Sequence, residues 1–189
     1  MLGSDMPAVQ KQSLTTDEFL AWSDAQIGRW ELFDGVPVLM APERAGHAAT
    51  KFAAQTALVA AIGRAKLPCW MLPDGMTVRV DNRSAFEPDA LVYCGAAVST
   101  DAIEIPNPVI VVEVLSPGTE ARDHGAKLAG YFSLPSVAHY LILDPERRVL
   151  IHHKRGQGDI IETRILTEGL LRLDPPCLEA PVADMFAAE

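Results

Sequence analysis

Apolar residues in this chain occur mainly as short runs whose pattern predicts β-strands. The run 108–115 is apolar except for one acid, Glu113, and a Ser-Pro-Gly sequence follows it. Because β-branched residues fill it without polar alternation, this run predicts a central strand that is buried on both faces. A second apolar run, 86–93, also contains an acid, Asp89. The two runs predict strands that can lie side by side in one sheet.

Further strands are predicted where apolar runs flank turn sequences. Residues 30–33 and 36–40 predict two strands joined by a tight Asp34-Gly35 turn. Pro37 places the second of these strands at a sheet edge, because proline has no N–H to donate to a neighbour. The same signals predict strands at 69–72 and 76–80 around a Pro-Asp-Gly turn, and at 137–143, 148–153 and 160–166.

Three segments have the spacing and the end signals of helices. A capping box from Thr15 to Glu18 predicts a short helix that follows a loose start, residues 1–14. The alanine-rich segment 46–64 predicts the longest helix, and 123–133 predicts another. The residues available for the buried face of the longest helix are Phe52, Leu58, Val59 and Ile62.

The composition predicts one globular domain, 1–189, without a basic surface. The chain has 189 residues, of which 49% are hydrophobic and 22% charged, and this is ample material for one core. Its formal net charge is -9. A nucleic-acid partner would therefore have to meet a local positive patch or metal ions.

The three cysteines, Cys69, Cys94 and Cys177, are far apart and form no Cys-x-x-Cys pair. This spacing predicts reduced thiols in a reducing compartment and no disulfide framework. The N-terminal residues lack the basic start and apolar segment of a signal peptide, and no apolar run reaches about 18 residues. We therefore expect a soluble cytoplasmic protein without a membrane partner.

An acid inside an apolar strand requires a compensating interaction. An ionised Glu113 in apolar surroundings would cost several kcal/mol without a partner, a metal or a raised pKa. One interpretation is a strand-end glutamate that reaches solvent, or a Lys or Arg partner. The other is a pair with Asp89, whose carboxylate would suit a hard divalent cation. The second interpretation indicates metal-assisted hydrolysis.

The predicted helix 123–133 follows the Glu113 strand and has polar residues on one face. Asp123, Lys127 and Tyr131 are spaced by four residues, which places them together on that face. An exposed Asp123–Lys127 pair would contribute only a few tenths of a kcal/mol. Near the end of the strand, Lys127 could instead reach a phosphate or an attacking water.

These residues, with others, resemble a known family. The Pro88-Asp89 pair followed by Glu113-Val114-Leu115 is similar to the PD-(D/E)XK nuclease motif, with Leu115 at the usual lysine position. The ordered blocks resemble the Uma-type family of putative restriction endonucleases from about residue 30 to 145. The blocks are Trp30-Glu31-Leu32-Phe33-Asp34-Gly35 with Met40-Ala41-Pro42, His47, Glu87-Pro88-Asp89, and Val112-Glu113-Val114-Leu115-Ser116-Pro117 with Asp123, Lys127 and Tyr131.

The resemblance implies an α/β fold with a restriction-endonuclease-like core. This core is a central mixed β-sheet flanked by helices, to which the chain adds N-terminal and C-terminal β-hairpins. In the family pattern the active-site lysine comes from the helix after the glutamate strand, which makes Lys127 the candidate here.

The resemblance also implies roles for individual residues. Asp89 and Glu113, with the Val114 carbonyl, would hold Mg²⁺ or Mn²⁺, and Lys127 would orient the attacking water or stabilise transition-state charge. Glu31 resembles an accessory acid, although a solvated hairpin glutamate is an equal alternative. Three further residues are candidates for substrate binding: His47, Tyr131 and Arg79. His47, near a helix N-terminus, could contact a phosphate or be a solvated surface group, and Tyr131 could hydrogen-bond a phosphate or cover the core.

The leading hypothesis is a metal-dependent endonuclease that hydrolyses phosphodiester bonds, in DNA, as a homodimer whose two-fold symmetry matches the duplex. The alternative is a non-cleaving module that binds nucleic acid or protein on a nuclease-like fold. A positive groove that contains Arg79, Arg83, Arg122 and Lys127 would favour the nuclease. A hydrolase of small phosphoesters is a third interpretation, which a closed pocket would favour.

Overall fold

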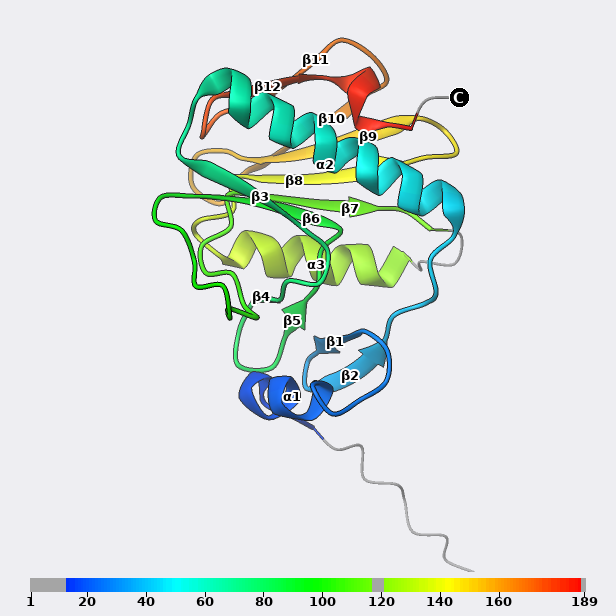
Figure 1. The fold of residues 1–189 in the computed structure, drawn as a ribbon, viewed down its shortest axis with the longest axis vertical. Coiled ribbons are helices and arrows are strands. Elements are labelled where there is room, and N and C mark those ends of the chain that lie inside the picture. Colours follow the sequence, from blue (N-terminus) through cyan, green and yellow to red (C-terminus); the bar gives the residue numbers. More distant parts are fainter. Residues whose placement is uncertain (1–12, 117–120, 188–189) are drawn as a thin grey trace, which may run out of the picture.

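The computed structural model has a mixed β-sheet at its centre. It describes residues 13–116 and 121–187, except for the side chains of residues 121–124. The strands of the sheet are β3 (Cys69–Pro73), β6 (Ala90–Cys94), β7 (Ile110–Val114), β8 (His139–Asp144), β9 (Val149–Arg155) and β10 (Ile161–Leu166). They are ordered β10-β9-β8-β7-β6-β3 (Figure 1). β7 and β8 run parallel, and the other neighbouring strands are antiparallel.

Helices cover both faces of this sheet. The helix α2 (Ala45–Ala65) lies across one face and α3 (Ala121–Ser133) across the other (Figure 1). Every residue of β7 is buried, with Val112 in the core cluster that contains α2 and Val111 in the cluster that contains Tyr131 of α3. The predicted central strand, buried on both faces, is therefore confirmed, as is the mixed sheet flanked by helices.

A smaller sheet lies on the side of α3 away from the larger sheet, and a short helix lies below the smaller sheet (Figure 1). The helix is α1 (Thr16–Ser23), and Thr15 and Glu18 make the predicted capping box. The strands are β1 (Trp30–Phe33), β2 (Val36–Leu39), β4 (Val78–Arg79) and β5 (Ala85–Phe86), in the order β2-β1-β5-β4. The predicted hairpin and the edge position of Pro37 are both confirmed.

The C-terminal part of the chain adds a hairpin over α2. The hairpin consists of β11 (Leu170–Leu173) and β12 (Leu178–Pro181), and a 3₁₀ turn, η1 (Val182–Met185), follows it. Leu171, Leu178 and Met185 are buried in the same cluster as Leu58 of α2. Strands over 170–173 and 178–181 were not expected from the sequence, whereas the predicted strands 137–143, 148–153 and 160–166 correspond to β8, β9 and β10, which pair as successive hairpins.

Two expectations about local structure were wrong. Residues 69–72 and 76–80 do not pair around their turn, because β3 belongs to the larger sheet and β4 to the smaller one. On α2, Phe52 and Val59 are 70% and 52% exposed, although they were expected on the buried face. The helix approaches the sheet through small residues instead, and these allow close packing. Its buried residues are Thr50, Lys51, Ala54, Ala57, Leu58 and Ala61.

The expectation of three reduced thiols is also corrected. Cys69 on β3 and Cys94 on β6 are a directly opposed cross-strand pair and form a disulfide. Both side chains contact the core cluster on the α2 side of the sheet. Cys177 is a free, exposed thiol. The pairing depends on the register of two strands that are 25 residues apart, so the spacing of cysteines along the chain did not reveal it.

Two buried histidines contact each other between β8 and β9. His139 Nε2 donates to the Pro175 carbonyl at 2.8 Å, so its Nδ1 can accept the Nε2–H of His152, also at 2.8 Å. His153 points to the other face of β9 and contacts Thr163. The expectation that His152 and His153 cannot share an ion is consistent with this geometry.

Among the residues that the structure describes, none of the helices combines the length and the apolar character that a membrane crossing requires.

Neighbouring substitutions on α2 test which face of the helix is buried. Leu58 is fully buried and Val59 is 52% exposed. We expect Leu58→Ala to lower the free energy of unfolding by about 2 to 5 kcal/mol because it leaves a cavity. Val59→Ala, the matched control, should change it by less than about 0.5 kcal/mol. Denaturant unfolding curves measure both, and similar losses in the two variants would contradict this orientation.

Lowering the pH should destabilise the fold through the histidine pair. Burial lowers the pKa of His139 and of His152 from 6.5 to about 4. Between pH 6.5 and pH 4 the unfolded chain binds more protons than the folded protein does. The stability that is present at pH 7.5 is therefore lost as the pH falls through 6.5 towards 4. We expect a loss of about 2 kcal/mol at pH 5 for one such histidine.

Thermal melts between pH 7.5 and 5 check this expectation. His152→Gln keeps an amide that can donate to His139 but does not titrate, so it should flatten the fall of Tm with pH. His153→Gln should retain most of the slope, because His153 lies on the opposite face. An unchanged slope in His152→Gln would exclude the pair as its source.

Candidate active site

The two predicted metal-binding acids meet at adjacent strand ends. β6 and β7 are antiparallel with Ala90 opposite Val112, so Asp89 and Glu113 are each the next residue beyond this pair, and the charge of Asp89 acts on the Glu113 carboxyl. The Asp89 carboxylate accepts the N–H of Val114 at 2.7 Å. This hydrogen bond holds the carboxylate at the end of β7.

The predicted strand 86–93 is divided in the structure. β5 ends at Phe86 in the smaller sheet, and β6 begins at Ala90 in the larger one. Pro88, between them, cannot donate to a strand neighbour. The segment 87–89 therefore crosses from one sheet to the other, and Asp89 enters the site from this crossing.

Lys127 is buried against Glu113. Its Nζ donates to Glu113 Oε1 at 2.9 Å, and the Tyr131 hydroxyl donates to the same oxygen at 2.8 Å. Lys127 and Glu113 are 7% and 8% exposed, and Tyr131 is fully buried. The four-residue spacing did place Lys127 and Tyr131 on one face of α3, but this face is buried, so the exposed-pair interpretation was wrong.

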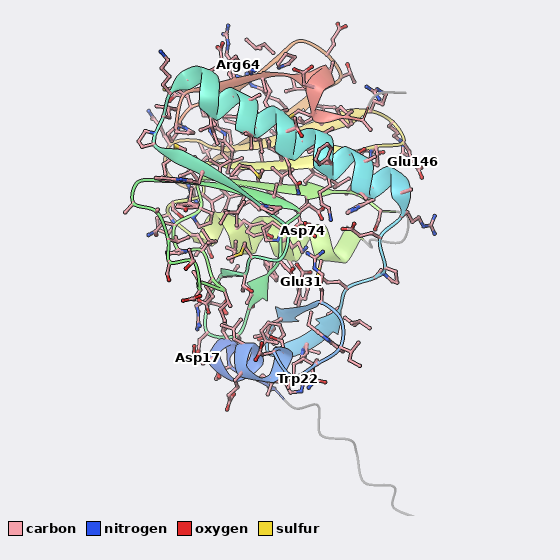
Figure 2. All side chains as sticks on the ribbon, viewed as in Figure 1. Asp17, Trp22, Glu31, Arg64, Asp74 and Glu146 are labelled. Carbon is pink, nitrogen blue, oxygen red and sulfur yellow. A yellow bond between two sulfur atoms is a disulfide. The ribbon has the colours of Figure 1, made fainter. Side chains whose placement is uncertain are left out.

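Glu31 completes the environment of Lys127 from the smaller sheet. Its Oε1 lies 2.8 Å from Lys127 Nζ and also accepts the N–H of Glu87 at 2.8 Å. Glu31 is 6% exposed, so it is no solvated hairpin glutamate. Figure 2 labels Glu31 between the smaller sheet and the larger one. Lys127 is thus held between carboxylates of β1 and β7.

The electrostatics of this group favour a further cation. Burial raises the pKa of Glu113 to about 7, Lys127 opposes this rise, and the charges of Asp89 and Glu31 add to it. Burial alone would lower the pKa of Lys127, but Glu113 and Glu31 raise it above its usual value. The lysine is therefore protonated, and one ammonium faces more than one carboxylate charge.

His47 lies at the same strand end. Its Nε2 is 3.0 Å from the Val114 carbonyl oxygen and 3.5 Å from Asp89 Oδ2, and its Nδ1 is 3.8 Å from Glu43 Oε1. The hydrogen bond with Asp89 raises the pKa of His47, and burial opposes the rise. These contacts exclude a solvated surface histidine. One ligand atom each from Glu43, His47 and Asp89 lie within 4.8 Å of one another.

A network of charges beside His47 was missed in the sequence. Lys51 is 7% exposed, and its ammonium contacts Glu43 and, at 3.0 Å, Asp74. Arg29 lies 2.5 Å from the same Asp74 oxygen, and Figure 2 labels Asp74. One signal was available, because Glu43, His47 and Lys51 are spaced by four residues, which puts them on one side of the start of α2.

The remaining candidate residues lie away from the Lys127 group or have side chains that the structure does not describe. Arg79 pairs with Glu104 at 2.6 Å and with Asp17 at 2.6 Å, so the structure does not bring it to the Lys127 group. Arg83 pairs with Asp34. The side chains of Arg122 and Asp123 lie outside the described residues. Burial of Tyr131 also revises its expected role, from contact with a substrate to contact with Glu113.

A family model described as Uma2, putative restriction endonuclease, matches residues 16–184. The chain belongs to the Uma2 family. The uncharacterized protein slr1290 of Synechocystis sp. is 27% identical over 155 residues, which cover 81% of this chain and 80% of the relative. The uncharacterized protein sll1609 of the same organism is 25% identical over 158 residues, 82% of this chain and 89% of the relative.

A solved structure shares the fold of this Uma2 chain. A putative nuclease belonging to DUF820 from Anabaena variabilis superposes with a TM-score of 0.72, and the match covers 92% of this chain and 97% of the other. The sequence identity is 15%. The family resemblance seen in the motifs and the nuclease-like α/β fold are therefore both confirmed.

Removing the buried ammonium should destabilise the metal-free Uma2 protein. Lys127→Met would leave the Glu31 and Glu113 carboxylates buried without their cation. We expect a loss of about 3 to 5 kcal/mol in the free energy of unfolding. Because a nearby positive charge opposes a second one, Mg²⁺ should recover more stability in this variant than in the wild type.

Denaturant unfolding with and without Mg²⁺ measures both effects. Lys154→Met on β9 is the control, since Lys154 contacts neither Glu31 nor Glu113. Equal stability of the Lys127 and Lys154 variants would mean that the carboxylate contacts of Lys127 contribute nothing.

Proposed function

We propose that this Uma2 protein is a metal-dependent endonuclease that hydrolyses phosphodiester bonds, with DNA as the substrate. One observation carries the proposal. A protonated lysine on α3 is held between two buried carboxylates, and a third carboxylate, Asp89, accepts the Val114 N–H at the end of β7. Acids at a strand end can hold a metal ion that activates water, and a lysine beside them can stabilise the charge that develops in phosphodiester hydrolysis.

The residues at the end of β7 fit a hard divalent cation. Asp89, Glu113 and the carbonyl of Val114 offer the oxygen ligands that Mg²⁺ and Mn²⁺ prefer. The raised pKa of Glu113 supports this assignment, because it reflects negative charge that a bound cation would relieve. When bound, such an ion lowers the pKa of an attacking water and neutralises charge on the phosphoryl group.

Lys127 supplies the fixed positive charge of the mechanism. Its ammonium would orient the attacking water and stabilise the charge that develops as the P–O bond to the leaving group breaks. Glu31 is a positioning residue, since it holds Lys127 in place and favours its protonated form. Tyr131 has a similar effect on Glu113, because its hydroxyl donates to the oxygen that also accepts from Lys127.

The partner that we propose is duplex DNA, cleaved by a homodimer whose two-fold axis matches that of the duplex. The family description, putative restriction endonuclease, supports DNA. A second candidate is a non-cleaving module that binds nucleic acid or protein on this fold. The net charge of -9 supports its protein-binding form, because an acidic protein repels the phosphates of nucleic acid.

A cleavage assay separates the two functions. Plasmid, single-stranded DNA and RNA are incubated with Mg²⁺, with Mn²⁺ or with EDTA. We expect metal-dependent cleavage of DNA, a fall of about 10²-fold or more for Glu113→Gln and Lys127→Met, and full activity for the control Lys154→Met.

Metal binding is measured on the same proteins. Mg²⁺ should raise the Tm of the wild type and should do less for Glu113→Gln. DNA binding without cleavage under any of these cations would favour the binding module. Cleavage that survives Lys127→Met would remove Lys127 from the mechanism.

A further inference from the structure

Beside the acids of the proposed mechanism lies a group of different ligand chemistry. Glu43 precedes α2, His47 is in its first turn, and Asp89 leads into β6. Their ligand atoms lie within 4.8 Å of one another. Ligands about 2.0 to 2.2 Å from one ion are at most about 4.4 Å apart, so only a small movement is needed. Glu43, which is exposed, can make that movement.

The hydrogen bonds of His47 prepare one ring nitrogen for a metal. The Val114 carbonyl can only accept a hydrogen bond, so Nε2, 3.0 Å away, carries the hydrogen. In the neutral ring, Nδ1 then has the lone pair. Nδ1 is buried, has no hydrogen-bond partner among the described residues and lies 3.8 Å from Glu43 Oε1. The ring faces Asp89 Oδ2 through Nε2, at 3.5 Å, so the ring must also turn for Nδ1 to share an ion with Asp89. A backbone carbonyl that fixes the tautomer is a common feature of histidine metal ligands.

The charges beside this group allow Glu43 to change partners. Lys51 contacts Glu43, but it also lies 3.0 Å from Asp74. If Glu43 turned to an ion, Lys51 would keep Asp74 as its counterion. Lys51 would still oppose an incoming cation, so its removal should favour binding.

We propose that Glu43, His47 and Asp89 form a second cation subsite, which takes Mn²⁺, Co²⁺ or Zn²⁺ in preference to Mg²⁺. Imidazole nitrogen binds Co²⁺ and Zn²⁺ more tightly than Mn²⁺, which stands lowest among the first-row divalent ions, whereas Mg²⁺ prefers oxygen ligands. The inference goes beyond the proposed endonuclease and depends on it only in that both sites use Asp89. It makes His47 a metal ligand that distinguishes between ions, where its place near a helix N-terminus had suggested a phosphate contact.

Mn²⁺ bound to the full chain provides a direct test at pH 8, because metal binding needs the neutral ring. Electron spin-echo envelope modulation detects a nitrogen ligand of Mn²⁺, and calorimetry measures the affinity. We expect a nitrogen signal in the wild type and its loss in His47→Gln, with Mn²⁺ bound at least about tenfold more weakly. Glu43→Gln should weaken Mn²⁺ binding while keeping the nitrogen signal, and Lys51→Met should tighten it.

The controls separate this inference from the proposed function. His153→Gln should retain both signal and affinity, and circular dichroism checks that each variant is folded. A wild type that binds Mn²⁺ without a nitrogen signal, or a signal that survives His47→Gln, would overturn the subsite even if Mg²⁺-dependent cleavage persists. A nitrogen signal that depends on His47 in a protein that cleaves nothing would support the subsite and reject the endonuclease.

Discussion

The contact of the Lys127 ammonium with Glu31 and Glu113 is the interaction on which the site depends. It joins three elements, since Lys127 comes from α3, Glu113 from the larger sheet and Glu31 from the smaller one. Each charge is buried, so none is tolerable alone, whereas together they neutralise one another in part. The contact that holds the smaller sheet against the larger one therefore also builds the group that we assign to catalysis.

The partial neutralisation links this structure to a chemistry. Asp89 and Glu113 lie at neighbouring ends of two antiparallel strands. The one positive charge of Lys127 compensates only part of the negative charge of Asp89, Glu113 and Glu31. A divalent cation would compensate the remainder. This local balance also explains how a chain of net charge -9 could act on nucleic acid, because metal ions would supply the positive charge that the surface as a whole does not.

The sequence was sufficient wherever the cause of a structure is local. The capping box at Thr15, the Asp34-Gly35 hairpin and the buried strand β7 depend on neighbours a few residues away, and each is present as predicted. The face shared by Lys127 and Tyr131 likewise follows from helical spacing. The ordered motifs also predicted the family and its fold.

Tertiary structure decided which partner each of these residues meets. Strand register places Cys69 opposite Cys94. The rotation of each helix against the sheet turns Phe52 outward and buries Lys127. Residues 69–80 divide between two sheets for the same reason. The network of Lys51, Glu43 and Asp74 shows this dependence on tertiary structure most clearly, because its members come from separate segments. Periodicity along the chain determines which face a side chain occupies, whereas contacts between distant segments depend on the packing of the whole fold, which no local pattern encodes.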